Sequence, residues 1–208
     1  MVRTPFVDGD FDFWPMYDRG EWEPETREVL ERFLGPGTVF IDIGAWIGPV
    51  SLWALDLGAF VHAYEPDPEA FKQLFVNTAG RTIRPRKAAV STRSGWARLT
   101  NPRFYGDSQS RIGDDGELVR TIPARWLPIQ KAALVKCDIE GHELVVLPDL
   151  LGACEAHSVP LYLSWHEELW GDTAVPADVR RSWFEGFELE PIRGDGWSGY
   201  SEVLAVPK

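Results

Sequence analysis

The sequence is short of cysteine, of cationic side chains and of long apolar runs. Cys137 and Cys154 are the only cysteines among 208 residues, which is too few for a disulfide framework and favours a reducing compartment. No apolar run approaches the length that crosses a bilayer. The N-terminal "MVRTPFVDGD" lacks the apolar core of a secretory signal. We therefore expect a cytoplasmic protein without a membrane partner.

Lysine and arginine are outnumbered by acids. The chain has 21 Lys and Arg against 32 Asp and Glu, so its formal net charge is −11. Polyanions would be repelled on average, and we do not expect a nucleic-acid partner. The run "RTIRPRK" at 81–87 is the strongest candidate for a local basic patch, although a solvated loop ahead of a strand would explain it too. No Cys/His spacing predicts a zinc site.

Aromatic residues, by contrast, are plentiful, and ten of them are tryptophans spread along the chain. Residues 1–25 form an aromatic and acidic stretch without periodicity, which we interpret as an N-terminal flap that includes Phe11, Phe13, Trp14 and Trp22. Such rings stack on a sugar or a flat ring system when they border a cleft, whereas buried rings would only pack a lid. The sequence leaves both alternatives open.

Strand-like and helix-like segments alternate from residue 38 onward. We predict strands at 38–43, 60–64, 86–91, 95–100, 132–139, 160–165, 187–192 and 201–206. We predict helices at 24–34, 46–58, 67–80, 142–152 and 176–186. Residues 101–117 are predicted to form a polar loop. This alternation favours an α/β fold in which a mainly parallel sheet has helices on both faces. We expect a single domain over 1–208 whose core sheet begins at 38, with an antiparallel strand pair at one edge.

The run "VFIDIGAWIG" at 39–48 fits a strand, a tight glycine turn and the start of a helix. In such sheets ligands bind beyond the carboxyl ends of the strands. Gly44 would allow the turn and a close ligand approach, and the helix N-terminus would present amides to that ligand. The dinucleotide fingerprint needs glycine where Trp46 and Pro49 stand, so a turn that binds nothing is the alternative.

Glu65 follows the next strand, in "VHAYEPDP". An acid about twenty residues after such a turn is placed to accept both hydroxyls of a ribose. A surface acid ahead of Pro66 is the alternative, but the pairing with the glycine turn favours ribose binding.

Acids crowd the run "VKCDIEGHELVVL" at 135–147, where Asp138, Glu140 and Glu143 lie between a strand and a helix. Acids at this point complement the helix dipole, but three exceed what capping requires. They could orient a cationic ligand, bind a metal or accept a proton. His142 is better explained by packing or by exposure to solvent.

His166, in "YLSWHEELW", follows a strand that should neighbour the Asp138 strand. An imidazole there could act as a general base near neutral pH. A hydrogen-bonded structural histidine explains it equally well.

Taken together, "FIDIGAWIG", "YEPDP" and "CDIEGHE" resemble the FkbM family of S-adenosylmethionine-dependent class I methyltransferases. The resemblance spans roughly residues 20–190, and "DIEGHE" is its most specific part. It implies a Rossmann-like, seven-stranded, mostly parallel sheet with an antiparallel last strand. It also implies methyl transfer, usually to oxygen, on small molecules, sugars or natural-product scaffolds.

The resemblance also implies a set of cofactor contacts. The residues around the methionine part are Asp42, Gly44, Ala45 and Gly48, and those around the ribose and adenosine are Glu65, Pro66 and Asp67. Asp138 would lie beside both cofactor and acceptor. Glu23 and Thr26 belong to a segment that can close over the cofactor. The family often has Asn at the position of Trp46. We predict that the Trp46 ring packs away from the sulfonium, as a wall of the adenosine pocket or under the first helix.

The favoured interpretation is therefore an S-adenosylmethionine-dependent O-methyltransferase with a small-molecule or glycan acceptor. His166 is the preferred proton acceptor, with Asp138 or Glu140 next. A divalent metal bound by some of these three is an alternative that we do not favour, because their spacing matches no all-protein cage.

Two other classes of protein stay open. A nicotinamide-dependent oxidoreductase would use a similar sheet, but the absence of glycine at position 46 and the "DIEGHE" run argue against it. A non-catalytic cofactor-binding or interaction module would suit the acidic surface, whereas Gly44, Glu65 and Asp138 argue against it. The sequence does not set the oligomeric state.

Overall fold

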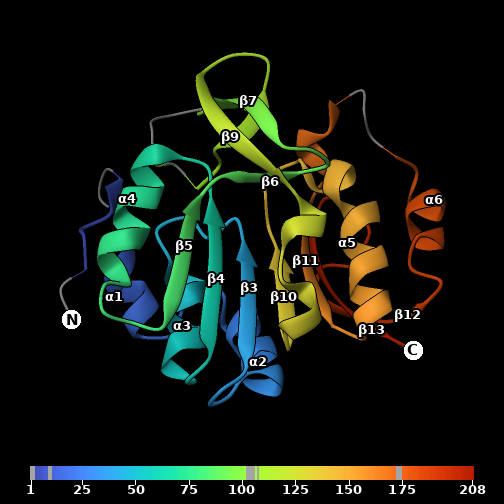
Figure 1. The fold of residues 1–208 in the computed structure, drawn as a ribbon, viewed down its shortest axis with the longest axis horizontal. Coiled ribbons are helices and arrows are strands. Elements are labelled where there is room, and N and C mark those ends of the chain that lie inside the picture. The colour runs from blue at the N-terminus through green and yellow to red at the C-terminus, as the bar shows by residue number, and fades with distance from the viewer. Residues whose placement is uncertain (1–2, 9–10, 102–105, 107, 172–174) are drawn as a thin grey trace.

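The computed structural model describes residues 3–8, 11–101, 106, 108–171 and 175–208. Its main element is a seven-stranded sheet in the order β12-β13-β11-β10-β3-β4-β5 (Figure 1). These strands are β3 (Val39–Ile43), β4 (Phe60–Glu65), β5 (Ile83–Lys87), β10 (Leu134–Cys137), β11 (Leu161–His166), β12 (Phe187–Arg193) and β13 (Tyr200–Pro207). Neighbours are parallel except at β13, which runs antiparallel to both β11 and β12. The predicted mostly parallel sheet with an antiparallel last strand is confirmed.

Helices cover both faces of this sheet, as predicted. They are α2 (Pro24–Phe33), α3 (Pro49–Asp56), α4 (Pro68–Asn77), α5 (Glu143–His157) and α6 (Ala177–Ser182). Alternate residues of β3 point to opposite faces: Phe40 joins the apolar cluster beneath α2 and α3, and Ile41 and Ile43 join the cluster beneath α5. Among the described residues, no helix has both the length and the apolar character that a bilayer crossing requires.

Several helices differ in extent from the sequence prediction; α4 ends at Asn77 rather than at 80, and α6 ends at Ser182 rather than at 186. Helix α3 begins at Pro49 rather than at 46, because Gly48 precedes it with a left-handed φ of 96° and proline favours the first helical position. Helix α5 continues beyond Gly152 to His157, since Cys154 extends its buried side by a further turn.

The segment between β5 and β10 departs most from the prediction. It forms a second, four-stranded sheet in the order β6-β9-β7-β8. Its strands are β6 (Ala89–Ser91), β7 (Gly95–Thr100), β8 (Arg111–Gly113) and β9 (Glu117–Pro123). The loop prediction is therefore wrong at 111–113 and at 117, while 102–105 and 107 lie outside the described residues.

The interpretation of "RTIRPRK" as a loop is also wrong. Ile83–Lys87 is β5, which forms the edge of the main sheet beside β4. Pro85 suits an edge strand, where one side of the backbone needs no partner. The strand predicted at 86–91 is accordingly divided between the two sheets.

The N-terminal segment packs onto the core instead of forming an irregular flap. It contains β1 (Val7–Asp8), β2 (Phe11–Asp12) and α1 (Phe13–Asp18). Phe13, Trp14 and Tyr17 are buried, and Tyr17 stacks on Trp53 of α3 with ring centres 4.9 Å apart. The Phe11 side chain lies outside the described parts of the structure.

Candidate active site

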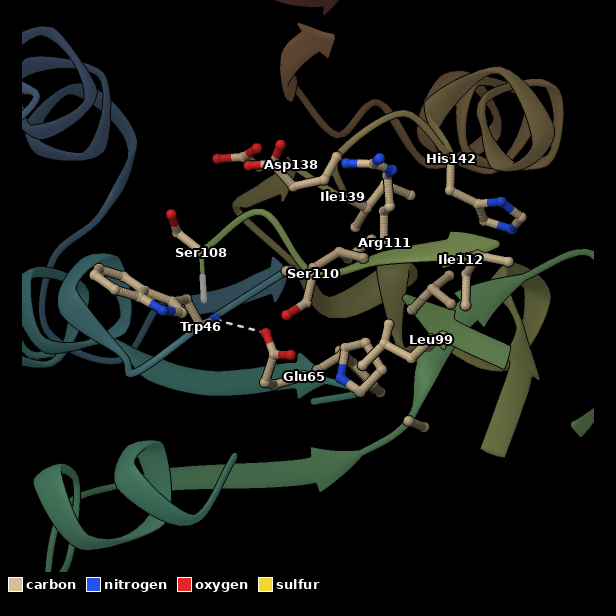
Figure 2. A pocket seen from close by; sticks show the side chains of 18 residues that line it. Trp46, Glu65, Leu99, Ser108, Ser110, Arg111, Ile112, Asp138, Ile139 and His142 are labelled. Carbon is tan, nitrogen blue, oxygen red and sulfur yellow. Dashed lines mark hydrogen bonds between the residues drawn. The ribbon is translucent and has the colours of Figure 1, made fainter. Parts of the chain in front are cut away.

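Two cavities adjoin at the carboxyl ends of the main-sheet strands. The first, which we call the slot, is a narrow space of about 40 Å³ beside Glu65 (Figure 2). The second, the chamber, measures about 670 Å³ and lies beside His166, within the size range of ligand pockets. The two share walls formed by Gly44, Trp46 and Asp138. A ligand in the chamber could therefore extend into the slot if the slot walls move apart, because a space of about 40 Å³ is smaller than an aromatic ring.

The glycine turn after β3 brings two strand ends together. Gly44 has φ 83°, and a Cβ atom there would lie 1.7 Å from the backbone oxygen of Asp138. Glycine is therefore required for β3 and β10 to meet. Trp46 adopts φ 49°, in the left-handed region that asparagine and glycine tolerate best. This gives a physical reason why asparagine suits the turn and why tryptophan is strained there.

The Trp46 side chain is held by a hydrogen bond to Gly106 and by aromatic contacts with the N-terminal segment. Its indole N–H donates to the backbone oxygen of Gly106 at 2.9 Å. Its ring meets Phe6 and Phe13 edge-on, with ring centres 4.8 Å and 4.9 Å away. The ring lies at one end of the slot, and His142 lies at the other (Figure 2). Trp46 is thus a wall between slot and chamber; its position relative to a bound sulfonium stays a prediction.

Glu65 is held at the mouth of the slot by two backbone amides. The N–H of Trp46 donates to Oε2 and the N–H of Asp67 donates to Oε1, both at 2.7 Å. Burial raises the pKa of Glu65 to about 8, against the effect of these two hydrogen bonds. In the ionised form of Glu65, each carboxyl oxygen can accept a further hydrogen bond. Val90, Leu99 and Ile139 make the adjoining slot wall apolar.

Asp67 holds the segment that borders the slot. Its Oδ1 accepts the N–H groups of Glu69 and Ala70 and so caps α4. Its Oδ2 accepts hydrogen bonds from Asn101, Gly106 and Ser110 at 2.9–3.0 Å. Asp67 therefore does not line the slot but fixes the backbone and side chains that border it.

A buried lysine lies beneath the acids that separate slot and chamber. Lys136 on β10 is 2 % exposed, and its Nζ donates to Asp138 Oδ2 at 2.7 Å. Burial disfavours its charge, but Asp138, Asp42 and Glu23 outweigh that effect and raise the pKa of Lys136. Sequence reasoning missed this residue, although a lysine within the apolar run "AALVKCDI" is itself a signal, because lysine is seldom buried without a partner.

The acids near Lys136 differ in their protonation. Burial raises the pKa of Asp42 to about 6, although Ser51 donates to its Oδ2 at 2.6 Å. Burial likewise raises the pKa of Glu23, which lines the chamber, to about 7. Burial also opposes the ionisation of Asp138, but the charges of Lys136 and His166 outweigh it and lower the pKa of Asp138. Asp138 is therefore the acid most firmly ionised at neutral pH.

His166 ends β11 among three carboxyl groups. Its Nδ1 lies 2.9 Å from Glu143 Oε1, and its Nε2 lies 3.5 Å from Asp138 Oδ1 and 3.6 Å from Glu140 Oε2. Burial disfavours the imidazolium, but the hydrogen bond to Glu143 and the carboxylate charges raise the pKa of His166 to about 9. The neutral imidazole that a general base needs is therefore scarce at pH 7, and the assignment of His166 as the base stays a prediction.

Glu143 positions both His166 and the turn before α5. It is fully buried and accepts the backbone N–H groups of Ile139 and Gly141 at 3.1–3.2 Å. Glu140, within this turn, has a left-handed φ of 52°. Burial raises the pKa of Glu140 to about 8, so it is mostly protonated at neutral pH. A strained residue with a shifted pKa beside a cavity is typical of a functional site.

Asp138, Glu140 and His166 could together bind one divalent cation. One ligand atom from each lies within 4.8 Å of the others. Glu143 holds Nδ1, so Nε2 is directed toward the two acids, as is common for histidines that bind metals.

The structure brings most of the predicted site residues to the two cavities and leaves others behind their walls. Those that line slot or chamber are Glu23, Gly44, Ala45, Glu65, Pro66, Asp138, Glu140 and His166. Those that support the walls are Thr26, Asp42, Gly48 and Asp67. His142 lines the slot, with Nε2 3.2 Å from Ser91 Oγ. Sequence reasoning missed Lys136, Tyr200, Phe6 and Glu168 in the chamber; apart from Lys136, these residues have no local signal.

Known methyltransferases resemble both the sequence and the fold. The hexuronic acid methyltransferase AglP of Haloferax volcanii is 29% identical over 153 residues, which cover 70% of this chain and 63% of that protein. The chain thus spans less than two thirds of the length of this relative. The FkbM methyltransferase of Methylobacillus flagellatus superposes with a TM-score of 0.55 at 16% identity, over 86% of this chain and 50% of that one.

The chain has an FkbM-like class I methyltransferase fold. A TehB-like S-adenosylmethionine-dependent methyltransferase of Corynebacterium glutamicum shares it, with a TM-score of 0.52 at 10% identity over 94% of each chain. No protein-family model matches the sequence. In a class I methyltransferase fold, slot and chamber occupy the ligand-binding edge of the sheet, beyond the carboxyl ends of the parallel strands.

Proposed function

We propose that this chain forms an S-adenosylmethionine-dependent methyltransferase domain that methylates a hydroxyl group of a sugar, either free or within a glycan. The observation that supports this most strongly is the buried Glu65, held by the Trp46 amide at the point where slot and chamber meet. The similarity to a hexuronic acid methyltransferase favours a sugar acceptor.

The residues of the slot fit the cofactor. Glu65 retains acceptor capacity for two ribose hydroxyls, and Val90, Leu99 and Ile139 offer an apolar surface for the adenine. Gly44 and Ala45 expose backbone toward the chamber, where the methionine part would lie near Glu23 and Asp138. Buried Asp42 has an Oδ1 atom without a hydrogen-bond partner among the described residues. This oxygen, close to Gly44 in the sequence, can still accept a hydrogen bond.

S-Adenosylmethionine supplies a methyl group on a positively charged sulfur, which is electrophilic without further activation. The chain therefore has to align an acceptor oxygen with that methyl group and exclude water. Trp46 and the rings of Phe6 and Phe13 close the chamber on the N-terminal side. The carboxylate of Asp138 suits a site that receives a cationic sulfur.

The acceptor hydroxyl must lose a proton as it reacts, and the chamber offers three groups to take it. His166 Nε2 and the carboxyl oxygens of Asp138 and Glu140 face one another across 3.5–3.6 Å. His166 accepts the proton in its neutral form, and Glu140 accepts it once ionised. Both forms gain population as the pH rises from 7 to 9, given pKa values of about 9 and about 8.

The chamber walls suit a sugar. Phe6, Phe13 and Trp22 contribute aromatic surface on one side, and Glu168 and Tyr200 contribute polar groups on the other. A sugar ring has apolar C–H faces that pack on aromatic rings and hydroxyls that bond to carboxylates.

Calorimetric titration with S-adenosylmethionine tests the proposed function. Glu65→Ala should weaken binding at least tenfold, about 1.4 kcal/mol, and Glu65→Gln should weaken it less because the amide keeps one acceptor oxygen. Glu69→Ala, an exposed acid of α4, is the matched control and should bind as the parent does. Equal affinities for Glu65→Ala and parent would remove the ribose assignment. Stronger thermal stabilisation by NAD than by S-adenosylmethionine would favour the oxidoreductase instead.

A metal-assisted form of the same reaction is the second candidate, favoured by the arrangement of Asp138, Glu140 and His166. A cation there would lower the pKa of the bound hydroxyl and keep His166 Nε2 unprotonated. Dialysis against a chelator, followed by activity with and without added Mg²⁺ or Mn²⁺, distinguishes the two forms. Activity that is lost on chelation and restored by metal supports the metal form, and unchanged activity rejects it.

A further inference from the structure

Positive charge is concentrated in one part of this acidic chain. Residues 81–131 contain 11 of the 21 Lys and Arg but only 4 of the 32 Asp and Glu, so this segment has a formal charge of +7 and the rest −18. The segment comprises β5 and the four-stranded sheet that follows it (Figure 1). The proposed methyl transfer makes no use of this charge.

A cavity of about 340 Å³, which we call the basic pocket, lies on this segment. His62 and Tyr64 of β4 are opposite Arg84 and Arg86 of β5 in the sheet register, so the four side chains share one face. Arg120 of β9 completes the group of cations around the cavity. The strand pattern thus directs three guanidinium groups to a single concave site.

Within the part of the chain that the structure describes, acids do not neutralise the cations of the basic pocket. Within the described residues, no ion pair links Arg84, Arg86 or Arg120 to a carboxylate; Arg84 instead lies over the Phe60 ring at 5.3 Å. Burial and the charges of Arg84, Arg86 and Lys131 lower the pKa of His62. The Nδ1 atom of His62 is buried and has no hydrogen-bond partner among the described residues. The site therefore has donors and positive charge but no internal anion.

A ligand that complements this site needs a charge of two or more in a small volume. Phosphate monoesters and diphosphates meet that requirement, and arginine forks bind their oxygens in pairs. Trp126 also lines the pocket, and 58% of its surface is exposed, which leaves its ring available for stacking. We propose that the basic pocket binds a phosphorylated ring compound, with the phosphate on Arg84, Arg86 and Arg120 and the ring on Trp126.

The basic pocket is separate from the chamber and adjoins the slot. Tyr64 lines both the slot and the basic pocket, so its ring is a wall between them. The chamber, where the acceptor would react, shares no lining residue with the basic pocket. The proposal therefore stands or falls independently of the methyltransferase function.

Calorimetric titration with inorganic pyrophosphate tests the anion site. The parent protein should bind it at physiological ionic strength, and Arg84→Ser/Arg86→Ser should weaken binding at least tenfold. Arg19→Ser/Arg27→Ser removes the same charge from exposed positions elsewhere and should leave binding unchanged. Both double variants should retain the circular dichroism and the S-adenosylmethionine affinity of the parent, since these arginines lie outside slot and chamber. Absent binding by the parent, or equal weakening in both double variants, would overturn the proposal.

Two further titrations identify the source of the phosphate. Uridine diphosphate and glucose 6-phosphate represent a nucleotide and a sugar phosphate. Uridine diphosphate is compared with pyrophosphate, and glucose 6-phosphate with orthophosphate. The compound whose ring fits should bind more tightly than its inorganic reference. Trp126→Ala should abolish this gain in affinity while it leaves pyrophosphate binding intact. If neither ring compound exceeds the inorganic anion, the assignment of Trp126 as a stacking platform is wrong.

Discussion

The slot and the chamber open at the same strand ends, but different parts of the chain build them. The slot combines the turns after β3, β4 and β10 with the four-stranded sheet, and its buried polar anchor is Glu65. The chamber adds the N-terminal segment, the end of β11 and Tyr200. Slot geometry therefore depends on the strand-end turns and the four-stranded sheet, whereas chamber geometry also depends on how the two end segments of the chain pack onto that edge.

The two cavities also differ in how their charges are balanced. Among the described residues, the groups that donate hydrogen bonds to Glu65 are backbone amides. In the chamber, Lys136 and His166 lie among Asp138, Glu140 and Glu143, and each charge shifts the pKa of its neighbours. A slot of this kind suits binding, and a chamber of this kind suits proton transfer. The following variants separate those two roles.

The largest effect is expected from His166→Ala in the chamber. It removes a proton acceptor and one of the two cations that stabilise ionised Asp138, the other being Lys136, so kcat should fall about 100- to 10,000-fold. The dissociation constant of S-adenosylmethionine, measured by calorimetry, should stay within about twofold because Glu65 is untouched. His157→Ala, at an exposed histidine of α5, is the control. Unchanged turnover would remove His166 from the mechanism.

A smaller effect is expected from pH. At pH 7 both Glu140 and His166 are mostly protonated, given pKa values raised to about 8 and about 9, and only the deprotonated forms accept a proton. The turnover number should therefore rise at least about tenfold between pH 7 and pH 9. A midpoint near 8 that disappears in Glu140→Gln identifies Glu140 as the base, and one near 9 identifies His166. A flat profile contradicts both assignments.

A still smaller effect is expected from Trp22→Ala, which removes an aromatic wall of the chamber. The KM for a sugar acceptor should rise about three- to tenfold, the value of one aromatic contact, with little change in the affinity for S-adenosylmethionine. Trp96→Ala, at a 67% exposed ring of β7, is the control. A rise in cofactor dissociation constant instead would place Trp22 at the cofactor.

The smallest effect on cofactor binding is expected from Trp46→Asn. Glu65 is held by the backbone N–H of residue 46, and asparagine tolerates the left-handed φ better than tryptophan. The dissociation constant of S-adenosylmethionine should change by less than about threefold. The melting temperature should fall, because contacts with Phe6 and Phe13 are lost. Loss of cofactor binding would show that the ring itself contacts the ligand.

Sequence reasoning predicted the strand-end residues of both cavities and missed much of the remaining walls. Gly44, Glu65 and Asp138 each follow a strand that is recognisable from its apolar run, and parallel strands bring their carboxyl ends to one edge. Phe6, Glu168 and Tyr200 reach the chamber only through tertiary packing, which no local pattern encodes. Residues 83–85 were missed as part of a strand because Arg84 and Pro85 are atypical of a buried strand, whereas β5 is an edge strand with one side of its backbone unpaired.

The protonation of the site was equally hidden from the sequence. His166 has an ordinary histidine pKa until Glu143, Asp138 and Glu140 surround it, and that arrangement arises only when β11 pairs with β10. Lys136 was the exception, because a lysine within a buried strand already implies an acidic partner. Burial and pairing, rather than residue type, decide these charges.

A crystal structure with S-adenosylhomocysteine bound would show directly whether Glu65 holds the ribose. We expect ribose hydroxyls within hydrogen-bond distance of both Glu65 oxygens, adenine in the slot against Ile139, and the sulfur directed into the chamber on the side of Asp138 and His166. The Trp46 ring should remain on Phe6 and Phe13. A ligand bound elsewhere, or a Trp46 ring filling the space that the homocysteine chain needs, would contradict this expectation.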